Sequence, residues 1–534
     1  MASATMLPAM QQYETFELRL AGGPSGSDVR ATFDLDGRRT ETKGFRAGDG
    51  AWVVRYLPLA AGTCHYAVSG AVEAEGTVAC AAAAPGRHGP VRAVGTHFAY
   101  DDGTLFRPFG TTVYALIHQD EALIDRTLAT LAAAPFNKVR MCVFPKSFVY
   151  NANEPPFFAF ARDAGGAFDF DRPDPMFWDA LERRIRQLDA LGFECDLILF
   201  HPYDRWGFAH MTQDQALAYV DHLTRRLSAF PNVWWSLANE YDLLDDFTNA
   251  RWAAIEEALA AGDPVGHLLS NHNFVRYWDF ADPHATHACL QSADMESAPA
   301  LMRRFGKPVV FDEFGYEGNI PHSWGNLSAF AQVDRFWKAC VLGAYATHGE
   351  TFADPDDVLW WAKGGVLKGE SPARIAFLRS LIDSMPGLLE PMPAFLADEE
   401  DPRAAVQATL DRGESAPGVP DAAFLRHLLT MSDDEIAKLA RFFRTLCGHV
   451  GNRAYLRYFS RECTAVGTLD LPEDGNYSVE VIDVWAMTRS TVRTDARGRV
   501  EIPLPGREGF ALLALRNDDP ATVSPGPARA DLKR

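Results

Sequence analysis

The hydrophobic pattern between residues 90 and 385 alternates two kinds of segment. Short, continuous apolar runs follow longer stretches in which apolar residues recur at helical spacing. In one such stretch the residues of one helix face are Phe177, Leu181, Ile185, Leu188 and Leu191, and the run CDLILF follows after Gly192. Because buried parallel strands read as apolar runs and their crossovers as amphipathic helices, the pattern predicts repeated strand and helix units.

Eight apolar runs qualify as the strands of one barrel. They lie near residues 107–114, 138–144, 195–200, 233–238, 267–271, 286–290, 308–312 and 343–350. Eight parallel units in series predict an α/β fold, the (β/α)8 or TIM barrel. The fifth and sixth runs are too close together for a regular crossover helix, so we expect none between them.

The chain on either side of the barrel has the alternating pattern of antiparallel strands. Residues 12–86 and 452–516 each contain several short segments separated by turn residues, which predicts a β-sandwich at each end. We expect an N-terminal β-sandwich over 1–88, the barrel over 89–387, a helical connector over 388–450, a C-terminal β-sandwich over 451–518 and a disordered tail over 519–534.

Composition and charge narrow the classes of function. The 534 residues are 47% hydrophobic and 23% charged, as in soluble globular proteins, and no apolar run is long enough to cross a bilayer. The net charge of -20 disfavours nucleic acid as a partner. The start lacks the pattern of a secretion signal, so a cytoplasmic location is expected. The eight cysteines are spaced as buried thiols, with a Cys64–Cys80 disulfide as the alternative.

Polar residues end each predicted strand, where barrel enzymes hold their reacting groups. In strand order they are Thr111, Thr112 and Tyr114; Arg140; His201, Tyr203 and Asp204; Asn239 and Glu240; Asn271, His272 and Asn273; His287 and Gln291; Asp312 and Glu313; and Glu350, followed by Trp360 and Trp361. The fourth and seventh strands lie across the barrel mouth from each other, so Glu240 and Glu313 can face one pocket.

Two facing carboxyl groups are what hydrolysis of a glycosidic bond requires. One must be protonated to donate to the leaving oxygen and the other ionised, so their surroundings must push their pKa values apart. We expect Arg140 to keep Glu313 ionised, and burial near Trp234 or Trp235, together with the neighbouring charge, to raise the pKa of Glu240. A retaining enzyme would hold the two carboxyl groups about 5 to 5.5 Å apart.

These residues resemble the motifs of the clan A glycoside hydrolases, retaining barrel enzymes related to family-five cellulases. The resemblance implies that Glu240 is the general acid/base, that Glu313 is the nucleophile and that Asn239 hydrogen-bonds the 2-hydroxyl of the sugar. Further sugar contacts are implied for Arg140, His201 and one aromatic residue, Trp360 or Trp361. A tyrosine that contacts the nucleophile from strand six in that clan has no counterpart in THACLQS, so Tyr316, Tyr277 or a histidine is expected to replace it.

A closer resemblance, to the apiosidase-like group of glycosidases, covers nearly the whole chain. It is carried by GFRAGDGAWVVRYLP near the N-terminus and by THGETF and LWWAKGGVLKGESPARIAFLR at the end of the barrel. We therefore predict a retaining glycoside hydrolase that is exo-acting on small oligosaccharides or plant glycosides, with a pentose or apiose-type sugar as one option. No metal, cofactor or membrane partner is expected, and self-association is left open.

Several alternatives remain open at this point. Tyr114 and His272 are further candidates for substrate binding, while Glu350 either contacts sugar hydroxyls or accepts from the backbone. If Trp360 and Trp361 lie on a strand, one is a sugar platform and the other core, because neighbours alternate. A metal-dependent hydrolase would use His201, His272, His284, His287 and an Asp as ligands, although FGTTVYAL lacks the His-x-His of such barrels. A carbohydrate-binding protein without catalysis is the remaining alternative.

Overall fold

A computed structural model of the chain describes residues 9–23, 28–353, 359–394, 401–413 and 421–517. The chain divides into two compact units. The first comprises Met1–Ala293, Phe305–Gln332 and Tyr345–Pro372, and the second comprises Asp294–Arg304, Val333–Ala344 and Ala373–Arg534. The N-terminal strands and all eight barrel strands belong to the first unit. Among the described helices, none combines the length and the apolar character that crossing a bilayer requires.

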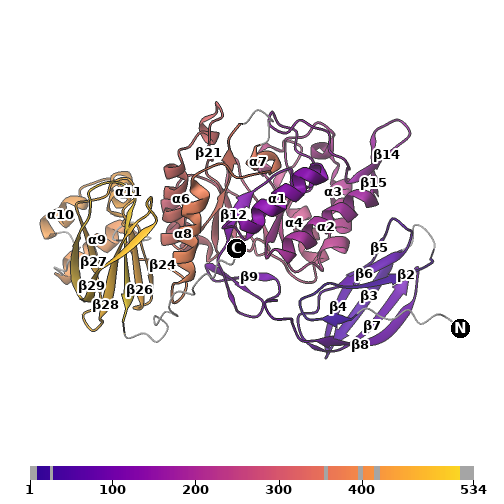
Figure 1. The fold of residues 1–534 in the computed structure, drawn as a ribbon, viewed down its shortest axis with the longest axis horizontal. Helices are drawn as coiled ribbons and strands as arrows, with labels where there is room; N and C mark the ends of the chain where they lie inside the picture. The colour runs from indigo at the N-terminus through magenta and orange to yellow at the C-terminus, as the bar shows by residue number, and fades with distance from the viewer. Residues whose placement is uncertain (1–8, 24–27, 354–358, 395–400, 414–420, 518–534) are drawn as a thin grey trace, which may run out of the picture. The chain divides into compact units, whose positions relative to one another are not determined.

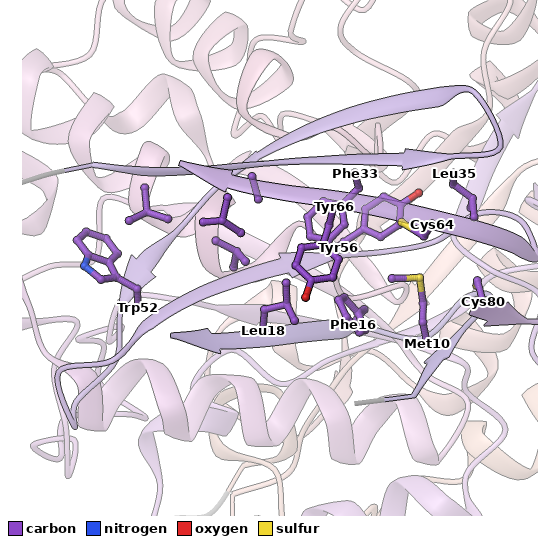
Figure 2. Close-up of a cluster of buried hydrophobic side chains, with 14 residues drawn as sticks. Met10, Phe16, Leu18, Phe33, Leu35, Trp52, Tyr56, Cys64, Tyr66 and Cys80 are labelled. Carbon is purple, nitrogen blue, oxygen red and sulfur yellow. The ribbon is translucent and has the colours of Figure 1, made fainter. Parts of the chain in front are cut away.

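The N-terminal strands form two sheets, as the alternating pattern predicts (Figure 1). One apolar core lies between these sheets. The sheet orders are β1-β8-β7-β3-β4 and β2-β6-β5. The strands are β1 Met10–Gln11, β2 Phe16–Leu20, β3 Val29–Leu35, β4 Arg38–Lys43, β5 Phe45–Arg46, β6 Trp52–Tyr56, β7 Gly62–Gly70 and β8 Ala74–Ala81. Phe33 of β3 stacks on Tyr56 of β6 with ring centres 4.5 Å apart (Figure 2). Cys64 and Cys80, like the other cysteines, are free thiols, so the alternative disulfide is wrong.

Eight parallel strands form the predicted barrel. They are β12 Phe109–Thr112, β13 Lys138–Cys142, β16 Glu194–Phe200, β17 Val233–Ala238, β18 Leu269–Ser270, β19 Ala288–Gln291, β20 Val309–Glu313 and β22 Tyr345–His348. The ladder runs β18-β17-β16-β13-β12-β22-β20-β19. A single parallel bridge between His272 and Cys289 joins its two ends. The predicted TIM barrel is therefore confirmed.

Helices follow the strands in the order that the pattern predicts. They are α1 Glu121–Ala133, α2 Pro175–Ala190, α3 Gln213–Leu227, α4 Asn249–Gly262, α5 Ala298–Phe305, α6 Ala329–Val341 and α8 Ser371–Asp383. Each of the first four begins at a side chain that accepts from a backbone N–H of the first turn: Asp120, Asp174, Thr212 or Thr248. No helix forms between Ser270 and Ala288, which the structure describes throughout, so that expectation is confirmed.

A small sheet covers the barrel end at which the strands begin. It contains β9 Val91–Val94, β10 His97–Tyr100 and β11 Leu105–Phe106. Phe98 of β10 is fully buried, with ring centres 5.2 Å from Trp234 and 5.3 Å from Tyr345, both near the starts of barrel strands. Because aromatic side chains fill the end at which the barrel strands begin, we expect ligands to bind at the end at which the strands stop.

The second unit holds most of α5, α6 and α8, and the C-terminal strands. Its sheets have the orders β24-β25-β26-β31-β28-β29 and β27-β30, and a shared apolar core lies between them. The strands are β24 Glu390–Pro391, β25 Cys447–Val450, β26 Ala454–Tyr458, β27 Val466–Asp470, β28 Tyr477–Asp483, β29 Thr488–Ala496, β30 Arg499–Pro503 and β31 Phe510–Arg516. Helices α9 Pro402–Arg412, α10 Ala422–Leu428 and α11 Asp433–Phe443 precede β25. The expected tail, 519–534, lies outside the described residues.

Candidate active site

Glu240 and Glu313 line the same cavity, which measures about 350 Å³. Glu313 is the last residue of β20, and Glu240 lies two residues beyond β17. The remaining lining is largely aromatic: Phe148, Tyr203, Phe274, Phe314, Tyr316, Trp324 and Trp361, with Lys146 and Gln291 among the polar members. A small, mostly apolar cavity with a few convergent polar groups is typical of a site for one small ligand. We call it the Glu240–Glu313 cavity.

Hydrogen bonds from two neighbouring strands hold the Glu313 carboxylate. Arg140 of β13 donates from Nη1 to Oε1 over 3.0 Å, and the Tyr114 hydroxyl, which follows β12, bonds the same oxygen. Arg140 also donates to the Tyr114 hydroxyl over 3.1 Å. The expected substitutes for the clan's tyrosine are Tyr316, Tyr277 or a histidine. The two tyrosines are wrong, because Tyr114, which follows the first strand, makes the contact, and of the histidines His272 comes within 3.9 Å of Glu313.

The cations around Glu313 keep it ionised. Burial alone would raise the pKa of Glu313, but His272, Arg140 and Lys146 together lower that pKa below its ordinary value. Burial also lowers the pKa of His272 to about 3, so this ring adds positive charge only in acid, and at pH 7 Arg140 and Lys146 are the charged groups beside Glu313. The buried guanidinium of Arg140 therefore does what the sequence analysis expected of it.

The Glu240 carboxyl has surroundings that favour its protonated form. Burial, and then the negative charge of Glu313, raise the pKa of Glu240 to about 7. The Tyr203 hydroxyl donates to Oε2, and Gln291, with its amide nitrogen turned inward, donates to Oε1 over 3.0 Å. Burial and the neighbouring charge are the expected causes, but the two tryptophans expected near Glu240 do not supply the burial. Trp234 packs against Phe98 at the opposite barrel end, and Trp235 donates to Asp263 over 3.0 Å.

The backbone at Glu240 is left-handed, with φ 55° and ψ 56°. Such a conformation is uncommon for a residue other than glycine and is concentrated at functional sites. The N–H of Glu240 donates to Nδ1 of His272 over 3.3 Å, and Nε2 of the same ring lies 3.9 Å from Glu313 Oε1. His272 thus connects the two glutamates.

Lys146, which the sequence analysis missed, brings a second cation to the cavity. Its ammonium lies 3.5 Å from the ring centre of Tyr114, 4.3 Å from Tyr203 and 5.2 Å from Trp361. The available signal was a lone lysine in the otherwise apolar run MCVFPKSF, four residues beyond β13. Tyr203 and Gln291 were placed at strand ends but given no role.

Not all of the predicted sugar-binding residues reach the cavity. Asn239 accepts from the Tyr114 hydroxyl at 2.8 Å, and its amide nitrogen has no partner among the described residues. His201 is buried, with Nε2 3.1 Å from the carbonyl oxygen of Phe144, and is not part of the lining. The structure therefore places Asn239 beside Glu313 and His201 behind the cavity wall.

Two of those residues need correction. Trp360 is buried and donates to Thr111 over 2.9 Å, whereas Trp361 lines the cavity. Both lie on the short helix α7, Trp360–Lys363, instead of a strand, and they face different sides because helix neighbours also diverge. Glu350 accepts from the backbone N–H groups of Lys368 and Gly369 and does not line the cavity. Its predicted sugar contact is wrong, and the backbone alternative holds.

The histidines of the metal-dependent alternative are dispersed. His287 packs against Trp234, His201 and His272 have the partners given above, and His284 is exposed. Across the described ranges, no three histidine, cysteine or acidic side chains come together in a group that could hold a metal ion.

Comparison with known proteins identifies the barrel. The family model described as apiosidase-like, catalytic domain, matches residues 93–370. Two models described as domains of unknown function, DUF5060 and DUF5605, match residues 9–71 and 443–515. No curated protein matches the chain.

Two solved structures extend this comparison. A "putative glycoside hydrolase" from Bacteroides vulgatus is 31% identical, with 95% of this chain and 99% of that chain covered and a TM-score of 0.81. A glycoside hydrolase family 5 structure from the same organism is 14% identical, with 82% and 96% covered and a TM-score of 0.59, which shows a shared fold.

Proposed function

Because this chain belongs to the apiosidase-like family of glycoside hydrolases, we propose that it cleaves glycosidic bonds with retention of anomeric configuration. One observation carries the proposal: two glutamates line one cavity, and their surroundings move their pKa values in opposite directions. A carboxyl group with a pKa near 7 suits a proton donor, and one kept ionised suits a nucleophile.

The first step uses both groups at once. Glu313 Oε attacks the anomeric carbon, and an ester bond forms there as the bond to the leaving oxygen breaks. Glu240 gives its proton to that oxygen. Arg140 and Tyr114 orient the attacking carboxylate through their hydrogen bonds to Oε1.

The second step reverses the roles. Glu240, now ionised, takes a proton from water, and the water oxygen attacks the anomeric carbon as the ester bond to Glu313 breaks. Two inversions at one carbon restore the original configuration. Tyr203 and Gln291 hold the Glu240 carboxyl in place through both steps.

We further propose that the substrate is short and is cleaved from its end. The volume of the Glu240–Glu313 cavity is at the lower end of the range for small-molecule sites, which favours a terminal sugar over an internal segment of a polymer. Its aromatic walls suit the apolar faces of a sugar ring. Small oligosaccharides and plant glycosides, including those with a pentose or apiose-type sugar, fit this description.

The test is a panel of aryl glycosides with the wild type, Glu313→Gln and the exposed control Glu73→Gln. We expect Glu313→Gln to lose at least about a thousandfold in kcat/KM and the control to match the wild type. Proton NMR of the first product should show the anomer of the substrate. An inverted product, or an active Glu313→Gln enzyme, would contradict the proposal.

A further inference from the structure

Lys146 places a positive charge in the Glu240–Glu313 cavity with no anion bound to it. Its side chain is 3% exposed, and within the described parts of the chain its ammonium makes neither a hydrogen bond nor an ion pair. The faces of the Tyr114, Tyr203 and Trp361 rings surround it instead. Aromatic faces stabilise a cation but do not neutralise it, so the charge acts on whatever anion lies nearby.

The other buried cation of the site, Arg140, is already paired with a carboxylate. Arg140 donates to Glu313 over 3.0 Å and lies beside the nucleophile throughout. In the free enzyme Glu313 is the ionised carboxylate, and Arg140 balances it. Lys146 adds a second positive charge that helps to lower the pKa of Glu313, but within the described parts of the chain it is not paired with that carboxylate.

The proposed reaction creates that state, and the present inference rests on the proposed function. When the ester bond to the sugar forms, Glu313 becomes neutral, and Glu240 becomes anionic because its proton has gone to the leaving oxygen. The negative charge has moved from the carboxylate beside Arg140 to the one held by Tyr203. The Tyr203 ring also forms part of the cage around Lys146.

We propose that Lys146 is a positioning residue that balances the negative charge of Glu240 in the glycosyl-enzyme and so supports the second step. Arg140 is paired with Glu313, whereas Lys146 acts on both carboxylates and is therefore available when the negative charge moves to Glu240. The aromatic cage holds the ammonium near both glutamates without pairing it permanently with either.

Other charged or titratable groups also act on this pair. Those that face Glu240 or Lys146 are Glu313 of β20, Arg140 and Cys142 of β13, Tyr114 after β12, His201 and Tyr203 after β16, and His272 after β18. His201 and His272 are neutral at pH 7, because burial lowers the pKa of each to about 3. Burial raises the pKa of Cys142 to about 12, so it is an uncharged thiol. Among these groups the cations are Arg140 and Lys146, and of the two Arg140 is the one that is hydrogen-bonded to Glu313.

The test compares Lys146→Met and Lys146→Gln with Lys146→Arg and the exposed control Lys43→Met. Glu240 must be protonated for the first step, so kcat/KM of the wild type falls as pH rises through about 7. Without the cation the Glu240 anion is less stable, so this alkaline limb should move to higher pH by roughly one unit in both neutral variants. Lys146→Arg and Lys43→Met should keep the wild-type limb.

A second readout isolates the second step. On a dinitrophenyl glycoside, whose leaving group needs no acid, release of the sugar from Glu313 limits turnover. We expect kcat and KM to fall together in the neutral variants and a burst of dinitrophenol to appear. Glu313→Gln, measured alongside, tests the proposed function separately.

The outcomes distinguish the two ideas. An unmoved alkaline limb in folded Lys146→Met and Lys146→Gln, with Glu313→Gln inactive, overturns only the role of Lys146. A rise in KM confined to glycosides that carry a carboxylate also overturns it, since Lys146 would then bind a substrate anion. Activity in Glu313→Gln overturns the proposed function itself.

Discussion

At the scale of single residues, the hydroxyl of Tyr114 connects three groups of the site. It accepts from Arg140 and lies within hydrogen-bond distance of both Glu313 and Asn239. A hydroxyl has one proton to donate, so it can serve only one of the two acceptors at a time. Tyr114 therefore couples the position of the nucleophile to that of Asn239.

Tyr114→Phe removes this hydroxyl and keeps the ring. A hydrogen bond to a charged group contributes about 1.5 to 3 kcal/mol, so kcat/KM should fall by roughly ten- to a hundredfold. Tyr316→Phe is the matched variant, because the Tyr316 hydroxyl is buried in the same cluster of side chains as Tyr114, without a hydrogen bond to any described residue. Steady-state kinetics should show a much smaller loss there. Equal losses in both variants would mean that the bond to Glu313 is not what matters.

The left-handed backbone of Glu240 is a second feature at this scale. A side chain in this region costs about 1 to 3 kcal/mol, which the packing of the barrel must offset. The geometry directs the carboxyl toward Tyr203 and Gln291. The left-handed backbone therefore lowers the stability of the fold at Glu240, the residue that we expect to transfer the proton.

At the scale of elements, two carboxylates hold the loop between α7 and α8. Glu350 accepts from the backbone N–H groups of Lys368 and Gly369, and Glu317 accepts from those of Glu370 and Ser371. Glu317 and Glu350 are partners in the short β21–β23 pair, Glu317–Gly318 with Glu350–Thr351. This loop follows directly after the helix that carries Trp361, so the two carboxylates help to position an aromatic wall of the cavity.

Gly369→Ala should break this arrangement. A Cβ at Gly369 would lie 2.7 Å from Glu350 Oε2 and even closer to Glu317 Oε2, so the loop must shift. We expect a loss of about 1 to 3 kcal/mol in the free energy of unfolding, together with a rise in KM. Thermal melting and kinetics would measure these effects. The control is Gly165→Ala, in the exposed turn between β14 Phe160–Arg162 and β15 Phe168–Pro173, which should change neither the free energy of unfolding nor KM. Equal effects in the two variants would refute the explanation.

At the scale of the molecule, buried ion pairs join the N-terminal sandwich to the barrel helices of the first unit. Arg55 of β6 donates to both carboxylate oxygens of Glu182 on α2, each over 2.8 Å, and to the backbone carbonyl of Arg226 on α3. Arg226 donates to Glu182 over 2.6 Å as well. All three side chains are at most 5% exposed, so the sandwich contributes to the stability of the barrel.

Arg55→Ala should destabilise the first unit without altering catalysis. Removing one partner of a buried ion pair lowers the free energy of unfolding by about 3 to 5 kcal/mol. Because Arg226 still pairs with Glu182, we expect a loss near the lower value. Urea unfolding would measure this, with the exposed Arg39→Ala as the control. The pH profile of kcat/KM should stay unchanged. A variant as stable as the control would mean that the sandwich is only loosely attached.

The sequence by itself determined the architecture and the two glutamates. The period of the apolar residues is a local property, because a helix or strand buries one face regardless of what covers it. It therefore predicted the eight barrel strands, the missing helix before β19 and the sandwiches. The same pattern located the ends of β17 and β20, and Glu240 and Glu313 were found because they lie at those ends.

Only the tertiary structure decided which side chains meet. Tyr114 and Glu313 are 199 positions apart in the chain, and Lys146 reaches the cavity from a loop whose path no periodicity encodes. The same limit explains why Trp361 lines the cavity while Trp360 does not, and why Glu350 accepts from the backbone. Contacts between side chains depend on strand register, loop conformation and rotamers at once, and those are settled when distant segments pack together.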